Sequence, residues 1–97
     1  MPSSTAVVFT DAAARYAKQL VAHLGRKVAV EDVDGTARRL VFGYGTGVVR
    51  PEPDRLVLDA WAGDEESLAQ VQDVLTRHLE RFGARRALAV DWQRVDQ

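Results

Sequence analysis

The feature that most constrains the fold of this chain is an Asp-Gly pair. It stands between two segments in which apolar side chains occupy every second position. The valines of residues 28–31 occupy alternate positions, and in residues 37–42 Leu40 and Phe42 share one face. Asp34 and Gly35 stand between these two runs. A type I′ turn requires positive φ at both central positions, and an Asp-Gly pair meets this requirement. The pattern predicts a β-hairpin, and with it a mainly antiparallel sheet.

Two segments outside this hairpin have the periodicity of amphipathic helices. The first covers residues 11–24 and carries an apolar stripe of Ala13, Tyr16, Ala17, Leu20 and Leu24. We expect Thr10 or Asp11 to cap its start and Gly25 to end it with positive φ. The second opens at residues 63–67 and is expected to end at Gly83. Its stripe is formed by Leu68, Val71, Leu75, Leu79 and Phe82.

Further strands are predicted at residues 6–9, 46–50 and 55–62. Between them, the glycine-rich segment 43–47 predicts a bend or bulge. It joins strand to strand, whereas a phosphate-binding loop joins a strand to a helix. Two prolines in residues 51–54 predict a turn. Residues 87–92 are expected to form a final short strand or a docked tail.

These elements predict a single α+β domain over residues 1–97. We expect an antiparallel sheet of four to five strands, in β-α-β-β-β-β-α order, packed with two amphipathic helices. Residues 55–62 carry apolar side chains on both faces, since Leu56 and Leu58 alternate with Val57 and Trp61. Such a strand needs a cover on each side. The second cover is expected to be either the tail with Trp92 or another subunit.

Composition excludes several classes of function. Thirteen Lys and Arg residues face fourteen Asp and Glu residues, and a net charge of −1 gives no field that would gather nucleic acid. The chain has no cysteine, which removes thiolate catalysis and thiolate metal sites and favours a reducing cytoplasm. Apolar runs are only a few residues long, so neither a membrane span nor a signal peptide is predicted.

No group of residues has the spacing of a catalytic site. The serines lie in a tail and a helix cap, without a nucleophile elbow. The carboxylates do not pair at a spacing suited to general acid–base work. Positive residues gather at the end of the second helix, where they complement the helix dipole; binding of an anion is the less favoured interpretation. This cluster consists of Arg77, Arg81, Arg85 and Arg86.

The two histidines are the strongest candidates for a binding site. His23 lies about 60° to one side of Leu20, and His78 about 60° to the same side of Leu75, so each borders the core. Tyr16 shares the flank of His23. If the helices pack together, the imidazoles can approach each other and hold a zinc or iron ion. The alternative is that each imidazole bonds a backbone carbonyl.

The chain also resembles a known family, the small bacterial proteins grouped as domain of unknown function 2218. The resemblance extends over most of the chain, and its most specific part is the His-Leu-Glu-Arg-Phe segment with a Trp ten residues further on. The matching positions are 15–20 continuing through His23 to Lys27, Phe42 with Gly45, 78–82, Arg85, Leu88, and Asp91 with Trp92. The resemblance implies an α+β fold, in agreement with the predicted elements.

Two departures from the family pattern bear on function. Members often have Cys before the first His and an aromatic residue after it, where this chain has Ala22 and Leu24. A Cys can also follow the central Gly-Thr, where this chain has Gly47. A thiol therefore cannot contribute to a site here. The resemblance implies an association with siderophore-interacting proteins. An aldolase label carried by some relatives does not fit a chain too short for an aldolase barrel.

The leading hypothesis is a non-enzymatic binding or accessory domain of the cytoplasm. Its site would lie around Tyr16, His23 and His78, for a metal ion or an iron chelate, with iron-uptake proteins as partners. The alternative is a structural or interaction module that acts as a homodimer, with no small-molecule site. A small hydrolase or lyase has the least support, because it would need both histidines and a carboxylate in one deep polar pocket.

Overall fold

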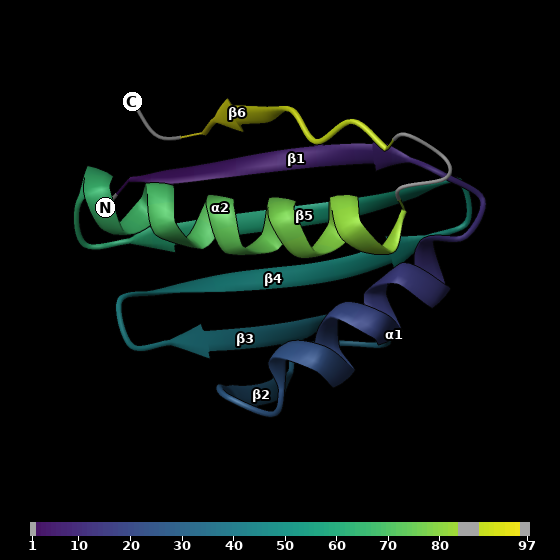
Figure 1. Ribbon diagram of the computed structural model, residues 1–97, viewed down its shortest axis with the longest axis horizontal. Helices are drawn as coiled ribbons and strands as arrows, with labels where there is room; N and C mark the ends of the chain where they lie inside the picture. The colour runs from purple at the N-terminus through teal and green to yellow at the C-terminus, as the bar shows by residue number, and fades with distance from the viewer. Residues whose placement is uncertain (1, 84–87, 96–97) are drawn as a thin grey trace.

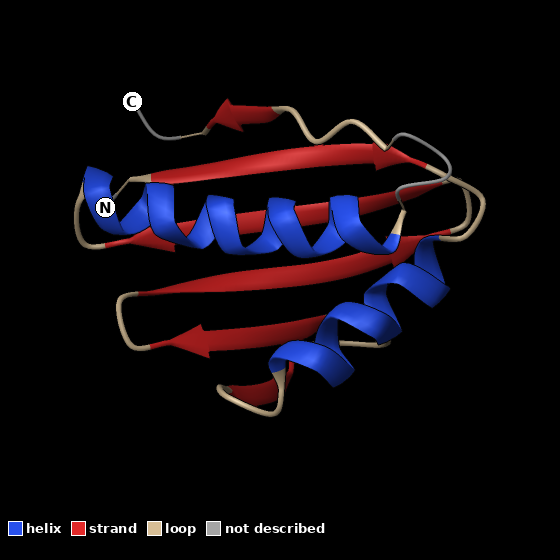
Figure 2. Ribbon diagram, viewed as in Figure 1, coloured by secondary structure: helices blue, strands red, loops and turns tan. Residues whose placement is uncertain are grey.

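The computed structural model describes residues 2–83 and 88–95, which form one antiparallel sheet with two helices on the same face (Figures 1 and 2). The sheet has six strands in the order β2-β3-β4-β5-β1-β6. In chain order the elements are β1 (Ser3–Phe9), α1 (Ala13–Leu24), β2 (Ala29–Asp32), β3 (Arg38–Phe42), β4 (Gly45–Glu52), β5 (Arg55–Ala62), α2 (Glu65–Phe82) and β6 (Trp92–Arg94). The predicted α+β class is confirmed.

The core lies between the helices and one face of the sheet. Helix α2 runs along β5, while α1 crosses β4 and β3 obliquely toward β2 (Figure 1). Along β5, Leu56 and Leu58 are fully buried beneath the helices. The predicted stripe of α1 is buried along its whole length, and so is that of α2 apart from the half-buried Phe82. Burial of these stripes is what fixes the helices on the sheet.

The sheet contains one strand more than the largest number expected. Residues 92–94 form β6, which pairs with β1 at its free edge. The tail is thus a strand, although its predicted start at Ala87 lies outside the described residues. Trp92 is paired with Ala6 and points to the helix side, where its Nε1 donates a hydrogen bond of 2.8 Å to Thr76 Oγ1. The expectation that Trp92 covers the other face of β5 was therefore wrong.

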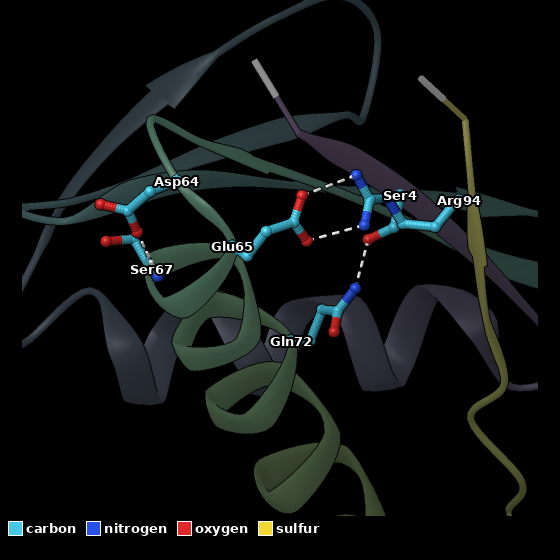
Figure 3. A network of polar contacts seen from close by, with 6 residues as sticks. All are labelled: Ser4, Asp64, Glu65, Ser67, Gln72 and Arg94. Carbon is cyan, nitrogen blue, oxygen red and sulfur yellow. Dashed lines mark hydrogen bonds and ion pairs between the residues drawn. The ribbon is translucent and has the colours of Figure 1, made fainter. Parts of the chain in front are cut away.

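A polar network joins the tail and β1 to the start of α2 (Figure 3). Arg94 donates two hydrogen bonds to the Glu65 carboxylate, at 2.7 and 2.9 Å. Gln72 Nε2 donates to Ser4 Oγ at 2.6 Å. Bidentate Arg–carboxylate pairs fix geometry as well as adding energy. The Arg94–Glu65 pair and the Trp92 bond hold the short strand β6 against α2, and the Gln72–Ser4 bond holds β1 there.

The predicted hairpin between β2 and β3 is confirmed, with its turn shifted by one residue. Ala37 N donates to the Asp34 carbonyl at 2.7 Å, so Gly35 and Thr36 are the central residues. Gly35 has a φ of +46°. We expected Asp34 and Gly35 to be central. The loop is longer than two residues because Val33 bonds back to Ala37 before the strands begin.

The glycine-rich segment 43–47 is a hairpin turn followed by a strand. Gly43 and Tyr44 form the turn, and β4 already begins at Gly45. A Cβ on Gly45 would lie 2.7 Å from Val71 Cγ2, and one on Gly47 would lie 3.1 Å from Leu75 Cδ1. The close approach of α2 and of the Trp61 carbonyl therefore requires glycine at position 45, while at position 47 it leaves little room for a side chain. The predicted bend was wrong beyond Tyr44.

Two element boundaries and one backbone angle also differ from expectation. Strand β4 extends through Pro51 to Glu52, which is possible because β3 pairs with β4 only as far as Val49. Helix α1 begins two residues late, since Thr10 Oγ1 accepts a bond from Ala12 N and holds this segment in a turn. Gly25 ends α1 with a φ of −63°, so the positive φ expected there was wrong.

The start of α2 follows the expected chemistry of a helix N-terminus. Asp64 is the N-cap, and its carboxylate accepts a bond of 2.7 Å from Ser67 N (Figure 3). This bond lowers the pKa of the Asp64 carboxyl.

Neither helix of the described residues has the length and the apolar character that a membrane span requires.

Candidate functional site

The structure brings the two histidines together. His23 lies in the last turn of α1, and His78 lies about one turn before the end of α2. Their ring centroids are 4.9 Å apart, with the planes inclined by 50°. The flanks of the two helices meet because both stripes pack on the same sheet face. The matched positions of the histidines allow this arrangement when the helices pack side by side.

Phe82 completes a small cluster of rings at this point. Its ring lies 5.8 Å from His23, edge-on, and 6.4 Å from His78. Phe82 is half-buried and belongs to the apolar stripe of α2. Its place in this stripe predicts a core position only. Its spacing of four residues from His78, which places both on one helix face, is the signal that could have identified it.

The ring of His78 is held by its own helix. Its Nδ1 lies 2.7 Å from the carbonyl oxygen of Val74. Because a carbonyl oxygen only accepts, Nδ1 carries the proton, and Nε2 of the neutral ring keeps a free lone pair. Histidines that bind metals are commonly oriented by a bond of this kind. The alternative interpretation of the sequence was that each imidazole bonds a backbone carbonyl. Within the described residues, His78 makes such a bond and His23 does not.

The surroundings of the pair are positively charged. Loss of hydration where the ring packs against its neighbours is the main cause that lowers the pKa of His23 below its ordinary value of 6.5. Nearby positive charges lower it further. These belong to His78, Arg26, Arg81 and Lys27, in order of decreasing effect. His23 is therefore mainly neutral near pH 7, with a lone pair free to bind.

A polar hollow of about 390 Å³ adjoins His78 and is lined by Arg77 and Arg81. Arg77 is paired with Asp73, at 3.0 Å, one helical turn earlier. The helix dipole accounts for a basic cluster at this end of α2, and in the structure Arg77 and Arg81 also border His78. Arg26 and Lys27 follow His23 by three and four residues, and their charges act on its ring, whereas Arg81 is brought near by the packing of α1 against α2. Arg85 and Arg86 lie outside the described residues.

The arrangement limits the chemistry that the site can support. In residues 2–83 and 88–95 no group of three or more His, Asp or Glu side chains could hold a metal ion. Two imidazoles can bind a metal, but the other ligands would have to come with it. The deep polar pocket with both histidines and a carboxylate, which a hydrolase would need, has no counterpart in this part of the chain.

Tyr16, the third residue predicted for the site, lies in the core. Its side chain is 2% exposed, and it packs with the buried stripe of α1. It precedes His23 by seven residues, or roughly 10 Å along the helix axis. Its ring is accompanied by Arg15, whose guanidinium carbon lies 5.5 Å from the ring centroid. The structure does not bring Tyr16 to the histidine pair.

Comparisons with known proteins agree with this fold. The NMR structure of PA4090 from Pseudomonas aeruginosa is 34% identical in sequence and superposes with a TM-score of 0.79, over 96% of each chain. No curated protein matches the chain. A family model described as "Uncharacterized protein conserved in bacteria (DUF2218)" matches residues 5–93. The chain therefore belongs to the DUF2218 family of bacterial proteins.

Proposed function

We propose that this protein is a non-enzymatic binding domain of the cytoplasm whose ligand site is the His23–His78 pair. The observation that carries the proposal is the 4.9 Å separation of the two ring centroids. Imidazoles that share a first-row metal each lie about 2.0–2.1 Å from it through one nitrogen, which requires rings this close. The bond from His78 Nδ1 to Val74 leaves Nε2 as the ligand atom.

The charge around the pair favours a metal carried in an anionic chelate over a bare ion. Arg26, Lys27 and Arg81 repel a divalent or trivalent cation, and no carboxylate completes the site within the described residues. A chelate with net negative charge would be attracted by the same side chains, and it would supply the ligands that the protein lacks. This is consistent with an association with iron-uptake proteins, which the family resemblance implies.

Titration calorimetry with iron(III) citrate tests this proposal. The wild-type protein should bind the anionic chelate with one site, and binding should weaken at least tenfold in a His23→Ala/His78→Ala variant. Zinc chloride should bind more weakly than the chelate, because the surrounding cations oppose it. The matched control is Gln19→Ala/Gln70→Ala, which removes two exposed side chains from the same helices.

Equal binding of iron(III) citrate by the wild-type protein and the double histidine variant would refute the site. Tighter binding of zinc chloride than of the chelate would refute the preference for an anion. Metal analysis of untagged protein gives an independent check. Equal, sub-stoichiometric metal in the wild-type protein and the histidine variant would contradict the metal role.

A second candidate function is self-association through the uncovered sheet face. Phe9 on this face is 73% exposed and Val7 is 39% exposed, while Trp61 and Val57 are half-buried. A second copy would cover these side chains. Charge supports the choice of this partner, since Arg50 and Asp59 lie on the same face and find no ion pair within residues 2–83 and 88–95. Across a two-fold axis, each can face the other.

Sedimentation equilibrium decides this second candidate. A dimer that dissociates on Phe9→Glu, but not on the exposed control substitution Ala69→Glu on α2, would support it. A wild-type monomer at micromolar concentrations would remove it. The histidine site does not depend on the outcome.

A further inference from the structure

A second hollow lies on the opposite flank of α1 from the histidine pair. It opens between α1, the β2–β3 turn and the ends of β3 and β4, and its volume is about 410 Å³. Its walls are mainly apolar, with Val21 on the helix and Val49 and Pro51 on the sheet. Small-molecule sites typically have volumes of about 300–1,000 Å³ and walls of this kind.

The hollow exists because α1 presents small side chains to this part of the sheet. Ala14, Ala17 and Ala22 line it from the helix, at positions where a larger residue would fill the space. Helix α1 crosses the strands obliquely (Figure 1), and the hollow lies where its small side chains face Val49 and Pro51. Ala14 and Ala22 are exposed, which places them near the opening, while Ala17 is buried.

The polar groups at this hollow include two cations. Lys18 is exposed and makes no hydrogen bond or ion pair within residues 2–83 and 88–95. Arg38 is fixed in place: its NH1 donates to the Ala37 carbonyl at 3.0 Å, and its Nε lies 3.1 Å from Asp32 Oδ1. Among the residues that line the hollow there is no carboxylate. An apolar cavity with cations at its rim is complementary to an amphiphilic anion.

We propose that this hollow binds a small monocarboxylate with an alkyl or aryl body. The body would lie against Val21, Val49 and Pro51. The carboxylate would pair with Lys18 and with NH2 of Arg38, because Nε and NH1 of that guanidinium are already engaged. The inference is independent of the histidine site, since the two sites lie on opposite flanks of α1 and share no lining residue.

Amide NMR spectra recorded during titration with octanoate test the proposal. Shifts should concentrate at the amides of Ala14, Ala22 and Thr36. Octylamine, which has an alkyl chain of the same length and the opposite charge, should bind more weakly. Lys18→Gln should weaken octanoate binding about two- to fivefold, the range for an exposed ion pair. Lys27→Gln removes the other lysine and should leave the affinity unchanged.

Variants that fill the cavity provide a second, independent test of the proposal. Ala14→Leu/Ala22→Leu adds bulk at the opening and should abolish the octanoate shifts, whereas Ala69→Leu on the exposed face of α2 should not. The His23→Ala/His78→Ala variant should retain them, which separates this site from the proposed chelate site. Equal shifts with octanoate and octylamine, or octanoate shifts elsewhere in the sheet, would overturn the proposal. Unchanged affinity in Lys18→Gln would also overturn it.

Discussion

The tautomer of His78 is fixed by its own helix, whereas the pKa of His23 is lowered by its neighbours. The carbonyl of Val74 fixes which nitrogen of His78 carries the proton. Packing and nearby cations keep His23 mainly neutral near pH 7, because they lower its pKa. A neutral imidazole is the form that binds a metal. The bond to Val74 fixes the tautomer of His78, whereas the lowered pKa favours the neutral form of His23.

The depressed pKa of His23 predicts a dependence of stability on pH. The pKa is lower in the folded protein than the ordinary 6.5, so the unfolded chain binds more protons between these two values. The free energy of unfolding should be unaffected above this range and fall as the pH decreases through it. Urea unfolding at about pH 7.5 and about pH 5 measures this change.

His23→Gln should reduce the acid-dependent loss of stability, because it removes the group whose protonation is opposed. Gln19→Ala, on an exposed position of the same helix, should retain the wild-type pH dependence. An identical loss in His23→Gln and the wild-type protein would show that folding does not lower the pKa of this imidazole.

Gly45 is required by packing. A Cβ at this position would lie 2.7 Å from Val71 Cγ2 and 2.9 Å from the Trp61 carbonyl oxygen. The backbone oxygen cannot move aside, so Gly45→Ala should destabilise the protein by about 1–3 kcal/mol. Gly43→Ala is the matched control, because a Cβ there meets nothing within 4 Å. Thermal or urea unfolding that shows equal stability for both variants would contradict the packing of α2 against β4.

At this scale the sequence predicts some roles and not others. The positions of His23 and His78 follow from helical periodicity, since each borders a stripe of apolar residues. Tyr16 has the same angular relation to its helix but is buried, because the depth of the core at each turn depends on how the helix is inclined to the sheet. The contact of Gly45 with Val71 joins residues from distant parts of the chain, and no local pattern records it.

Among the elements, β6 is too short for its backbone pairing alone to hold it, so contacts of its side chains hold it in place. It has three residues, and Trp92 Nε1 donates to Thr76 Oγ1 on α2 at 2.8 Å. A double-mutant cycle with Trp92→Phe and Thr76→Val should give a coupling energy of about 0.5–1.5 kcal/mol. Urea unfolding of the four proteins measures it. A coupling energy near zero would show that the tail is held without this bond.

The two helices were predicted more accurately than the sheet. A helical stripe is a local pattern, and both stripes are the buried faces observed. Strand β6 is too short to alternate visibly, and its partner β1 lies at the other end of the sequence. The prediction of a turn at Pro51 was wrong for a related reason. The place of Pro51 in β4 depends on where the neighbouring strand β3 ends, and the sequence of one segment does not reveal this.

In the molecule as a whole, one sheet face carries both helices. The proposed chelate site at the histidines and the proposed binding site for a monocarboxylate lie on the two flanks of α1. Helix α1 crosses the strands obliquely (Figure 1). His23 contacts His78 of α2 from one flank of this helix, and the second hollow opens on its other flank. The α+β architecture follows from the sequence. The inclination of the helix does not, because it arises from the packing of many side chains at once.

Imidazole nitrogen NMR of uniformly 15N-labelled protein tests the central claim most directly. The chain has two histidines, so each ring nitrogen can be followed during titration with gallium(III) citrate, a diamagnetic equivalent of the ferric chelate. Before titration, His78 should be protonated on Nδ1. Addition of the chelate should shift His78 Nε2 and one nitrogen of His23 together, with a single affinity. Unshifted imidazole nitrogens at saturating chelate would contradict the proposal that the His23–His78 pair is the ligand site.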